Sequence, residues 1–218
     1  MAPSQRKTLG SELQSMKIGA HDVLAASGLS LSNVFFPTGA VISVTAVSNK
    51  ATIEVRGVGS EGMLGADALR AIERRFDLAC QIGGSMLYMP VSTFRHFTEK
   101  HVLLRNLVSR YSMSVLAQMT QSVLCNGLHS IAERCARWLL TTSDRAGILD
   151  EFTLTHQSLA HMLGVRRSGV SVAVYRLQQL NIIDYRHGRI AIVDRRRLED
   201  ESCECYRLLV RETKRIFG

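Results

Sequence analysis

The sequence lacks an apolar run of membrane-spanning length. Its longest uncharged stretch extends from Val23 to the residue before Lys50, and serines, Pro37 and Gly39 interrupt it. A membrane helix needs about 20 predominantly apolar residues, so this stretch is too polar to cross a bilayer. The first ten residues, MAPSQRKTLG, also lack the apolar core of a signal peptide. We therefore expect a cytoplasmic protein with no membrane partner.

Disulfide and metal-site patterns are also missing. The chain has five cysteines, an odd number, and no C-x-x-C pair. In a protein expected in the cytosol, this argues against structural disulfides, and the spacing of a tetrahedral zinc site is absent. Cys203 and Cys205 lie two residues apart and could bind a metal or respond to oxidation, but we interpret them as incidental. We expect no metal site.

Enzyme signatures are missing as well. The sequence contains no nucleophile elbow, phosphate loop or cluster of metal ligands, so we expect a protein that is not an enzyme. Its 218 residues, 46% hydrophobic and 21% charged, are typical of a globular chain with one large or two small domains.

The sequence is rich in basic residues, and they are concentrated in its C-terminal part. The net charge is +8, and residues 154–197 carry eight arginines against Asp184 and Asp194, a net charge of +6. A block of this kind is typical of a nucleic-acid-binding face, although a solvated surface has the same composition. The sequence motif within residues 154–197 is therefore needed to distinguish a nucleic-acid-binding face from a solvated surface.

The N-terminal half is rich in short β-branched segments. We predict strands at 34–47, 51–59 and 84–94, because glycine, proline or Asn-Lys punctuates these segments. Between them, residues 61–76 read as a glycine turn that leads into a short helix. Several short strands close together predict an antiparallel roll or barrel.

A long helix is predicted from about residue 101. Residues 102–128 contain no proline, and apolar residues recur at steps of three and four along a stripe that widens to a second face. One face can cover its own domain while the other pairs with a second copy of the helix. The stripe is Leu104, Val108, Tyr111, Val115, Gln118, Ser122 and Cys125, widened by Leu107, Leu116, Met119 and Val123.

The chain is expected to divide after this helix. A second helix, IAERCARWLLTTSDRAG, follows it and ends at Gly147, so we place the boundary near 126–130. The predicted domains are 1–127, a roll with a dimerisation helix at about 100–126, and 128–218.

The segment LTHQSLAHMLGVRRSGVSVAVYRLQQL, residues 154–180, predicts a helix-turn-helix. Thr155 can cap the first helix, Gly164 can adopt the left-handed conformation that ends it, and a second helix starts near Arg167. Counted from His156, the small Ala160, the glycine and the docking Val170 occupy positions 5, 9 and 15, which is the spacing of known DNA-binding motifs.

The start of the second helix is expected to enter the major groove. An arginine donates two hydrogen bonds to guanine, and we assign this role to Arg167, with Arg166 on phosphate. His156 and its neighbours are assigned to phosphate, or His156 is an exposed histidine with no role. The candidate DNA-binding residues are Thr155, His156, Gln157, Arg166, Arg167, Ser168, Ser171, Val172, Arg176 and Arg189.

A hairpin is predicted directly after the recognition helix. In NIIDYRHGRIAIVD, residues 181–194, His187-Gly188 lies between alternating apolar residues and reads as a two-residue turn. A hairpin in this place is a wing, and Arg186 and Arg189 at its tip could contact the DNA backbone.

These residues resemble the Crp/Fnr family of bacterial transcription regulators. The resemblance extends from roughly His21 to Tyr206, and it includes VFFPTGAVISV, VGSEGMLG and IAERCARWLL upstream of the motif. It implies an α+β fold with an N-terminal cyclic-nucleotide-binding-like antiparallel β-roll, a long dimerisation helix and a C-terminal winged helix-turn-helix. It also implies a homodimer that binds double-stranded DNA and contacts RNA polymerase.

The chain departs from the cyclic-AMP-responsive members of the family in its phosphate cassette. Ala66 follows Gly65 where those members have glutamate, and Phe76 offers no serine hydroxyl. We therefore expect no cyclic nucleotide. The resemblance places an effector pocket at Gly62, Gly65, Arg74, Arg75, Met119 and Thr120.

Other cofactors of the family are not evident in the sequence. No cysteine precedes Cys80, so the N-terminal cysteine cluster of the iron–sulfur members is absent. Haem binding is not excluded, because His21, His96 and His101 could each supply an iron ligand. Nothing in the sequence favours one of these histidines over the others. Ser168 stands where many relatives have glutamate, which predicts a different operator base pair.

The prediction is a homodimeric, sequence-specific DNA-binding transcription regulator that recognises a two-fold-symmetric operator. The alternative is a ligand or redox sensor whose winged helix contacts proteins. Salt-dependent DNA binding distinguishes them, because it is expected only of the first.

Overall fold

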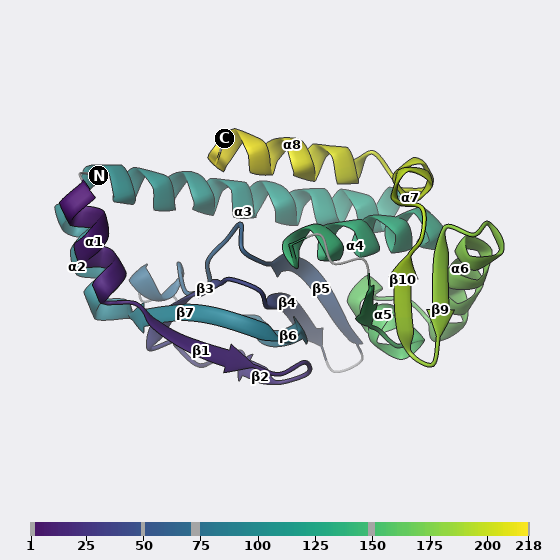
Figure 1. The fold of residues 1–218 in the computed structure, drawn as a ribbon, viewed down its shortest axis with the longest axis horizontal. Coiled ribbons are helices and arrows are strands. Elements are labelled where there is room, and N and C mark those ends of the chain that lie inside the picture. Colours follow the sequence, from purple (N-terminus) through teal and green to yellow (C-terminus); the bar gives the residue numbers. More distant parts are fainter. Residues whose placement is uncertain (1–2, 49–50, 71–74, 148–150, 218) are drawn as a thin grey trace.

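The computed structural model describes residues 3–48, 51–70, 75–147 and 151–217. Two antiparallel sheets form its N-terminal part, a long helix crosses the molecule above them, and a smaller unit of helices with a third sheet lies at the end of that helix (Figure 1). The predicted α+β class and its three-part order are confirmed.

The N-terminal sheets have the strand orders β1-β7-β3 and β2-β6-β4-β5. Apolar side chains from both, among them Ile42, Cys80 and Met86, are fully buried in a core between them. The elements are α1 (Pro3–Ser11), β1 (Gln14–Ile18), β2 (Val23–Ala25), β3 (Asn33–Pro37), β4 (Val41–Ser48), β5 (Ala51–Val58), the 3-10 turn η1 (Ala68–Arg70), β6 (Asp77–Ile82), β7 (Gly84–Pro90) and α2 (Val91–Lys100).

Two of the predicted strands have different bounds in the structure. The segment 34–47 is divided into β3 and β4 by a turn whose N–H groups, from Thr38 and Gly39, donate to the carbonyl of Ser85. The strand predicted at 84–94 ends at Pro90, where α2 begins, because a proline has no N–H to lose at a helix start. In the segment 61–76, Gly65 has a φ of +93° and η1 follows it, while residues 71–74 lie outside the described part.

The long helix α3 (Val102–Leu128) runs between the sheets and the C-terminal helix α8 (Cys205–Phe217), as Figure 1 shows. Part of the predicted stripe is buried: Leu104 and Tyr111 pack with residues of the roll, and Cys125 packs against Cys203 and Cys205 beside α8. The hydroxyl of Tyr111 donates to the carbonyl of Met63 and accepts from the Met63 N–H at 2.9 Å, which fixes α3 on the roll. Leu107, Leu116 and Val123, which widen the predicted stripe toward a second face, are exposed.

The C-terminal unit has its own core, which includes Trp138, Leu159, Val174 and Ile190. Its predicted helix after α3 is confirmed as α4, which starts with a capping box between Ser130 and Glu133. The elements are α4 (Ile131–Arg145), β8 (Glu151–Thr153), α5 (His156–Leu163), α6 (Arg167–Gln179), β9 (Ile183–Arg186), β10 (Arg189–Ile192), α7 (Arg195–Glu201) and α8. The division into 1–127 and 128–218 stays a prediction.

Within the described residues, no helix is both long enough and apolar enough to cross a membrane.

Candidate nucleic-acid interface

The helix-turn-helix has the local geometry that its sequence predicts. The Thr155 hydroxyl accepts a hydrogen bond from the N–H of Ser158 at 3.0 Å and caps α5. Gly164 ends α5 in the left-handed region, with φ +63° and ψ +38°, where a side chain would cost about 1–2 kcal/mol. Arg166 is the N-cap residue of α6, so the second helix begins at Arg167, as expected.

The two helices pack through the residues predicted to face inward. Ala160 is 1% exposed, which lets α6 approach α5 closely, and Val170 at the crossing is fully buried. The same core contains Leu159, Leu163, Ala173, Val174 and Leu177. Burial of this apolar set fixes α6 on α5, so the N-terminal end of α6 has a defined orientation.

Cationic and apolar side chains are exposed together at this end of α6. Arg166, Arg167 and Ser168 are exposed, and no carboxylate in the described structure pairs with either arginine. Val172 is 71% exposed and Tyr175 is 64% exposed on the same helix. Tyr175 was missed in the sequence, although its position three residues after Val172 places it on the same helix face.

His156 does not have the exposed setting considered for it. Its ring is half-buried and stacks on Tyr185 with centroids 4.4 Å apart, while Nδ1 is 2.9 Å from the Ser171 hydroxyl. Burial, and then the charge of Arg167, lower the pKa of His156. The histidine therefore joins α5 to α6 and β9, and its assignment to phosphate stays a prediction.

Several other candidate residues have partners inside the chain. Arg176 pairs with Glu201 at 2.8 Å, and Arg189 lies 3.3 Å from Glu151. The Gln157 amide is hydrogen-bonded to the ring of His161 at 2.7 Å. The assignments of these residues to DNA stay predictions, but each would have to exchange a protein contact for a DNA contact.

The predicted wing is present as the β9–β10 hairpin. His187 and Gly188 both have positive φ, 51° and 77°, as a two-residue turn of this hand requires. Arg186 and Arg189 flank the turn and are exposed, with Arg186 paired to Asp184. Strand β8, which was not predicted, pairs with β10 and completes a three-stranded sheet.

The C-terminal unit is docked on the roll through β5. The indole N–H of Trp138 donates to Glu54 at 3.1 Å, and Arg145 pairs with Glu61 at the same distance. Burial raises the pKa of Glu54, opposed by the hydrogen bond from the Ser43 hydroxyl. The first helix of the motif and its turn at Gly164 also lie against β5 of the roll.

The expected effector pocket corresponds only in part to a cavity. A cavity of about 400 Å³ lies between the roll and α3, and Gly65, Arg75 and Met119 line it, with Ala66 and Asp67. Gly62 lines a different cavity beside α1, and Thr120 is exposed on α3, so neither lines this cavity, and their assignment to an effector pocket stays a prediction. Arg74 lies outside the described residues.

Four residues that the sequence left apart converge at the end of α3. They are Cys125, His129, Cys203 and Cys205, whose ligand atoms all lie within 4.8 Å of one another. The expectation of no metal site rested on spacing along the chain. Two sequence features could have indicated this cluster. They are the four-residue step from Cys125 to His129 and the Cys-x-Cys pair that begins 74 residues after His129.

Comparison with known proteins agrees with this geometry. Residues 133–201 match the Crp-like helix-turn-helix domain. The structure of FixK2 from Bradyrhizobium japonicum aligns with a TM-score of 0.73 at 17% identity, covering 88% of this chain and 98% of that one. A CRP-family transcriptional regulator from Thermus thermophilus aligns with a TM-score of 0.71 at 16% identity, covering 86% and 96%.

A second Thermus thermophilus regulator, of the CRP/FNR family, gives a TM-score of 0.70 at 18% identity and covers 87% and 98%. No curated protein matches the sequence significantly. At these identities the matched structures establish the fold, while the domain match covers α4 to α7. The chain thus contains a Crp-like helix-turn-helix domain within the fold of the Crp/Fnr family of transcription regulators, as the resemblance of its sequence implied.

Proposed function

We propose that this protein is a sequence-specific DNA-binding transcription regulator that acts as a homodimer. The observation that supports this most directly is the pair of arginines at the start of α6. Both are exposed and have no carboxylate partner among the described residues, while the buried face of the same helix fixes their direction. Unpaired guanidinium groups on a rigid helix end suit the phosphates and guanine edges of a major groove.

The two arginines have different roles in this proposal. Arg167 is the first residue of α6, the end of the helix that enters the groove in this proposal. Its guanidinium group therefore hydrogen-bonds to a guanine edge. Arg166 precedes the helix as its N-cap residue and binds phosphate. Ser168, beside them, replaces the glutamate that would accept from cytosine, so the operator differs from that of many relatives at this base pair.

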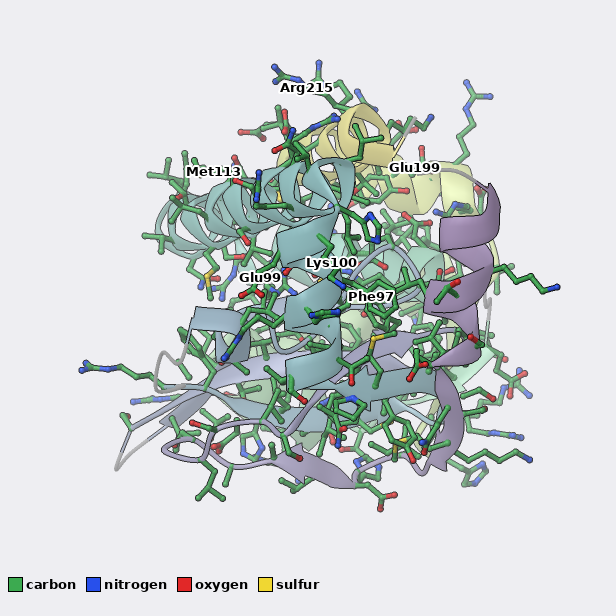
Figure 2. The ribbon with its side chains drawn as sticks, turned by 90° about the vertical axis from the view of Figure 1, so that its left-hand side faces the viewer. Phe97, Glu99, Lys100, Met113, Glu199 and Arg215 are labelled. Atoms are coloured by element: carbon green, nitrogen blue, oxygen red, sulfur yellow. The ribbon has the colours of Figure 1, made fainter. Side chains whose placement is uncertain are left out.

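The dimer is inferred from the outer face of α3. Along this face one series of exposed positions, four of them apolar, recurs at steps of three and four, which is the spacing of a helix paired with another helix. Met113 and Leu116 are 63% and 57% exposed, and Figure 2 shows Met113 on the outer side of α3, away from the strands. The repeat consists of Val102, Asn106, Ser109, Met113, Leu116, Thr120, Val123 and Gly127.

A dimer through this face explains two features together. It covers apolar side chains that would otherwise contact water, and it relates two copies of α6 by a two-fold axis. Two such helices read half-sites about 34 Å apart, one turn of DNA. Contact with RNA polymerase belongs to the same proposal, as the resemblance implies.

We infer that any signal received by the roll is not a cyclic nucleotide. The cavity beside α3 has Ala66 where the ribose hydroxyl would need an acceptor, and the carboxylate of Asp67 lines it. Arg56 and Arg75 also line the cavity, so the inference rests on the acceptor that Ala66 cannot supply and not on the charge of the lining. Most other lining groups are apolar, among them Val44, Met63, Leu64, Phe76, Leu78, Val115 and Met119.

The experiment is selection of bound DNA from a random pool by the purified protein, with and without cyclic nucleotides. The expected result is an inverted-repeat consensus that does not change when cyclic nucleotides are added. Its affinity should fall steeply as salt rises, because phosphate contacts release counterions. Absence of salt-dependent binding would support the alternative of a sensor whose winged helix contacts proteins. A consensus without two-fold symmetry would contradict the dimer.

A further inference from the structure

We propose that Cys125, His129, Cys203 and Cys205 form a closed, structural zinc site. The first two come from the last turn and the C-cap of α3, and the other two flank the start of α8. The three sulfurs are buried, and all four ligand atoms lie within 4.8 Å of one another. Three thiols and an imidazole make one of the common donor sets of structural zinc.

The distances within the group suit one tetrahedral ion. Sγ of Cys125 lies 3.5 Å from Sγ of Cys203, and Sγ of Cys205 lies 3.5 Å from Nδ1 of His129. With zinc–sulfur bonds of about 2.3 Å and a zinc–nitrogen bond of about 2.0 Å, tetrahedral angles place two ligand atoms about 3.5–3.8 Å apart. A set this compact surrounds one ion and leaves no room for an iron–sulfur core.

The imidazole is held in the orientation that a metal ligand needs. Its Nδ1 faces Cys205, while Nε2 lies 3.2 Å from the carboxylate of Glu204. Zinc-bound histidines commonly donate their second N–H to a carboxylate, which fixes the tautomer and increases the electron density at the metal-binding nitrogen. The contacts of His129 also favour a metal site over a redox-active cysteine pair. A disulfide between Cys125 and Cys203 would need neither the histidine nor the glutamate.

The surroundings supply hydrogen bonds and positive charge to thiolates. The Gln121 amide donates to Sγ of Cys205 at 3.0 Å. Arg134 and Arg137 lie near enough for their charges to act on Cys125, and each has a buried Nε without a hydrogen-bond partner in the described structure. Three thiolates around one Zn²⁺ carry a net charge of −1, which these guanidinium groups would balance.

The site would join two segments that are distant in sequence. Cys125 and Cys203 are 78 positions apart, and His129 lies at the junction of α3 and α4. A bound ion would fasten the start of α8 to the end of α3 and brace the joint between the roll and the helix-turn-helix unit. Because all four positions are filled by protein atoms, the ion would be structural and would have no open position for catalysis.

The first test is the zinc content of the full-length protein, measured by plasma mass spectrometry after gel filtration. The expected stoichiometry is about one Zn²⁺ per chain, as for other closed sites. Cys125→Ser and Cys203→Ser should remove it, whereas Cys80→Ser, a buried cysteine in the roll, should retain it. Wild-type protein that contains no zinc and takes up none when Zn²⁺ is added would overturn the proposal.

A second test reports the geometry of the site in the wild-type chain, and one conservative variant accompanies it. Co²⁺ replaces the zinc of the wild-type chain, and the expected spectrum has the intense visible bands of a tetrahedral ion with a thiolate charge-transfer band. Glu204→Gln should keep the stoichiometry and weaken zinc affinity by about 10–100-fold, the usual effect of removing such a partner. An octahedral cobalt spectrum, or an intact mass showing a Cys125–Cys203 disulfide in place of metal, would refute the site. Neither test depends on DNA binding.

Discussion

A Cβ atom placed on Gly164 would lie 2.7 Å from Cδ1 of Ile53, so the turn of the DNA-binding motif touches strand β5 of the roll. Glycine is therefore required at position 164 for two separate reasons. Its left-handed φ ends α5, and its missing side chain allows the roll to approach. Helix α6 begins three residues later, so the roll contacts the chain close to the start of that helix.

A two-residue mutant cycle should separate the two roles of Gly164. Gly164→Ala is expected to cost about 1–2 kcal/mol from the left-handed φ alone, and each kcal/mol lowers Tm by about 2–4 °C in a chain of this size. Combining it with Ile53→Ala should restore only the part caused by the clash. Tm measured by calorimetry checks this, and strictly additive effects would show that the contact does not matter.

Arg167→Ala should remove operator discrimination. A bidentate contact to guanine is worth about 1–3 kcal/mol, so the variant should bind the selected site and a site mutated at that guanine with similar affinity. Arg166→Ala is the matched control: it should weaken both sites equally and reduce the slope of log affinity against log salt by about 0.9. Competition gel shifts at several salt concentrations measure both. If Arg167→Ala still discriminates between the two sites, another residue contacts that guanine.

Charge on the outer face of α3 should dissociate the dimer. Met113→Glu combined with Leu116→Glu places carboxylates at adjacent seam positions, where burial against a second copy would be costly. Light scattering should report a monomer with weakened operator affinity. Leu29→Glu, at a leucine 63% exposed on the roll, is the control and should stay dimeric. A double variant that remains dimeric would mean that another surface makes the dimer.

His156 should make the winged helix sensitive to acid. Its folded-state pKa is lowered by burial and by Arg167, so the neutral ring is favoured in the fold. The stability that it contributes is therefore present above its ordinary pKa of 6.5 and lost as pH falls through the lower folded value. His156→Phe keeps a ring against Tyr185 and cannot take up a proton, so its Tm should fall less between pH 7 and 5.

The control for this prediction is His187→Asn, in the exposed wing turn where φ is positive and asparagine is tolerated. It should follow the wild-type profile of Tm against pH. Parallel profiles for wild type and His156→Phe would contradict the role given to the half-buried ring.

Features with local causes could be predicted from the amino-acid sequence. Thr155, Gly164 and Val170 specify a cap, a left-handed end and a docking residue through spacings of a few residues, and the structure has each of them. The wing turn at His187–Gly188 was predictable for the same reason. These signals predict backbone conformation within one or two turns of helix, so they need no knowledge of distant contacts.

Which side chains are exposed and which have partners depends on contacts between distant parts of the chain. Periodicity showed two usable faces on α3, but the burial of Tyr111 against Met63 determines which face meets the roll and leaves Thr120 outside the pocket. Likewise, His156 is held by Tyr185, 29 positions away. The thiols of Cys125 and Cys203 meet because α8 folds back along α3, a contact that spacing along the chain cannot reveal.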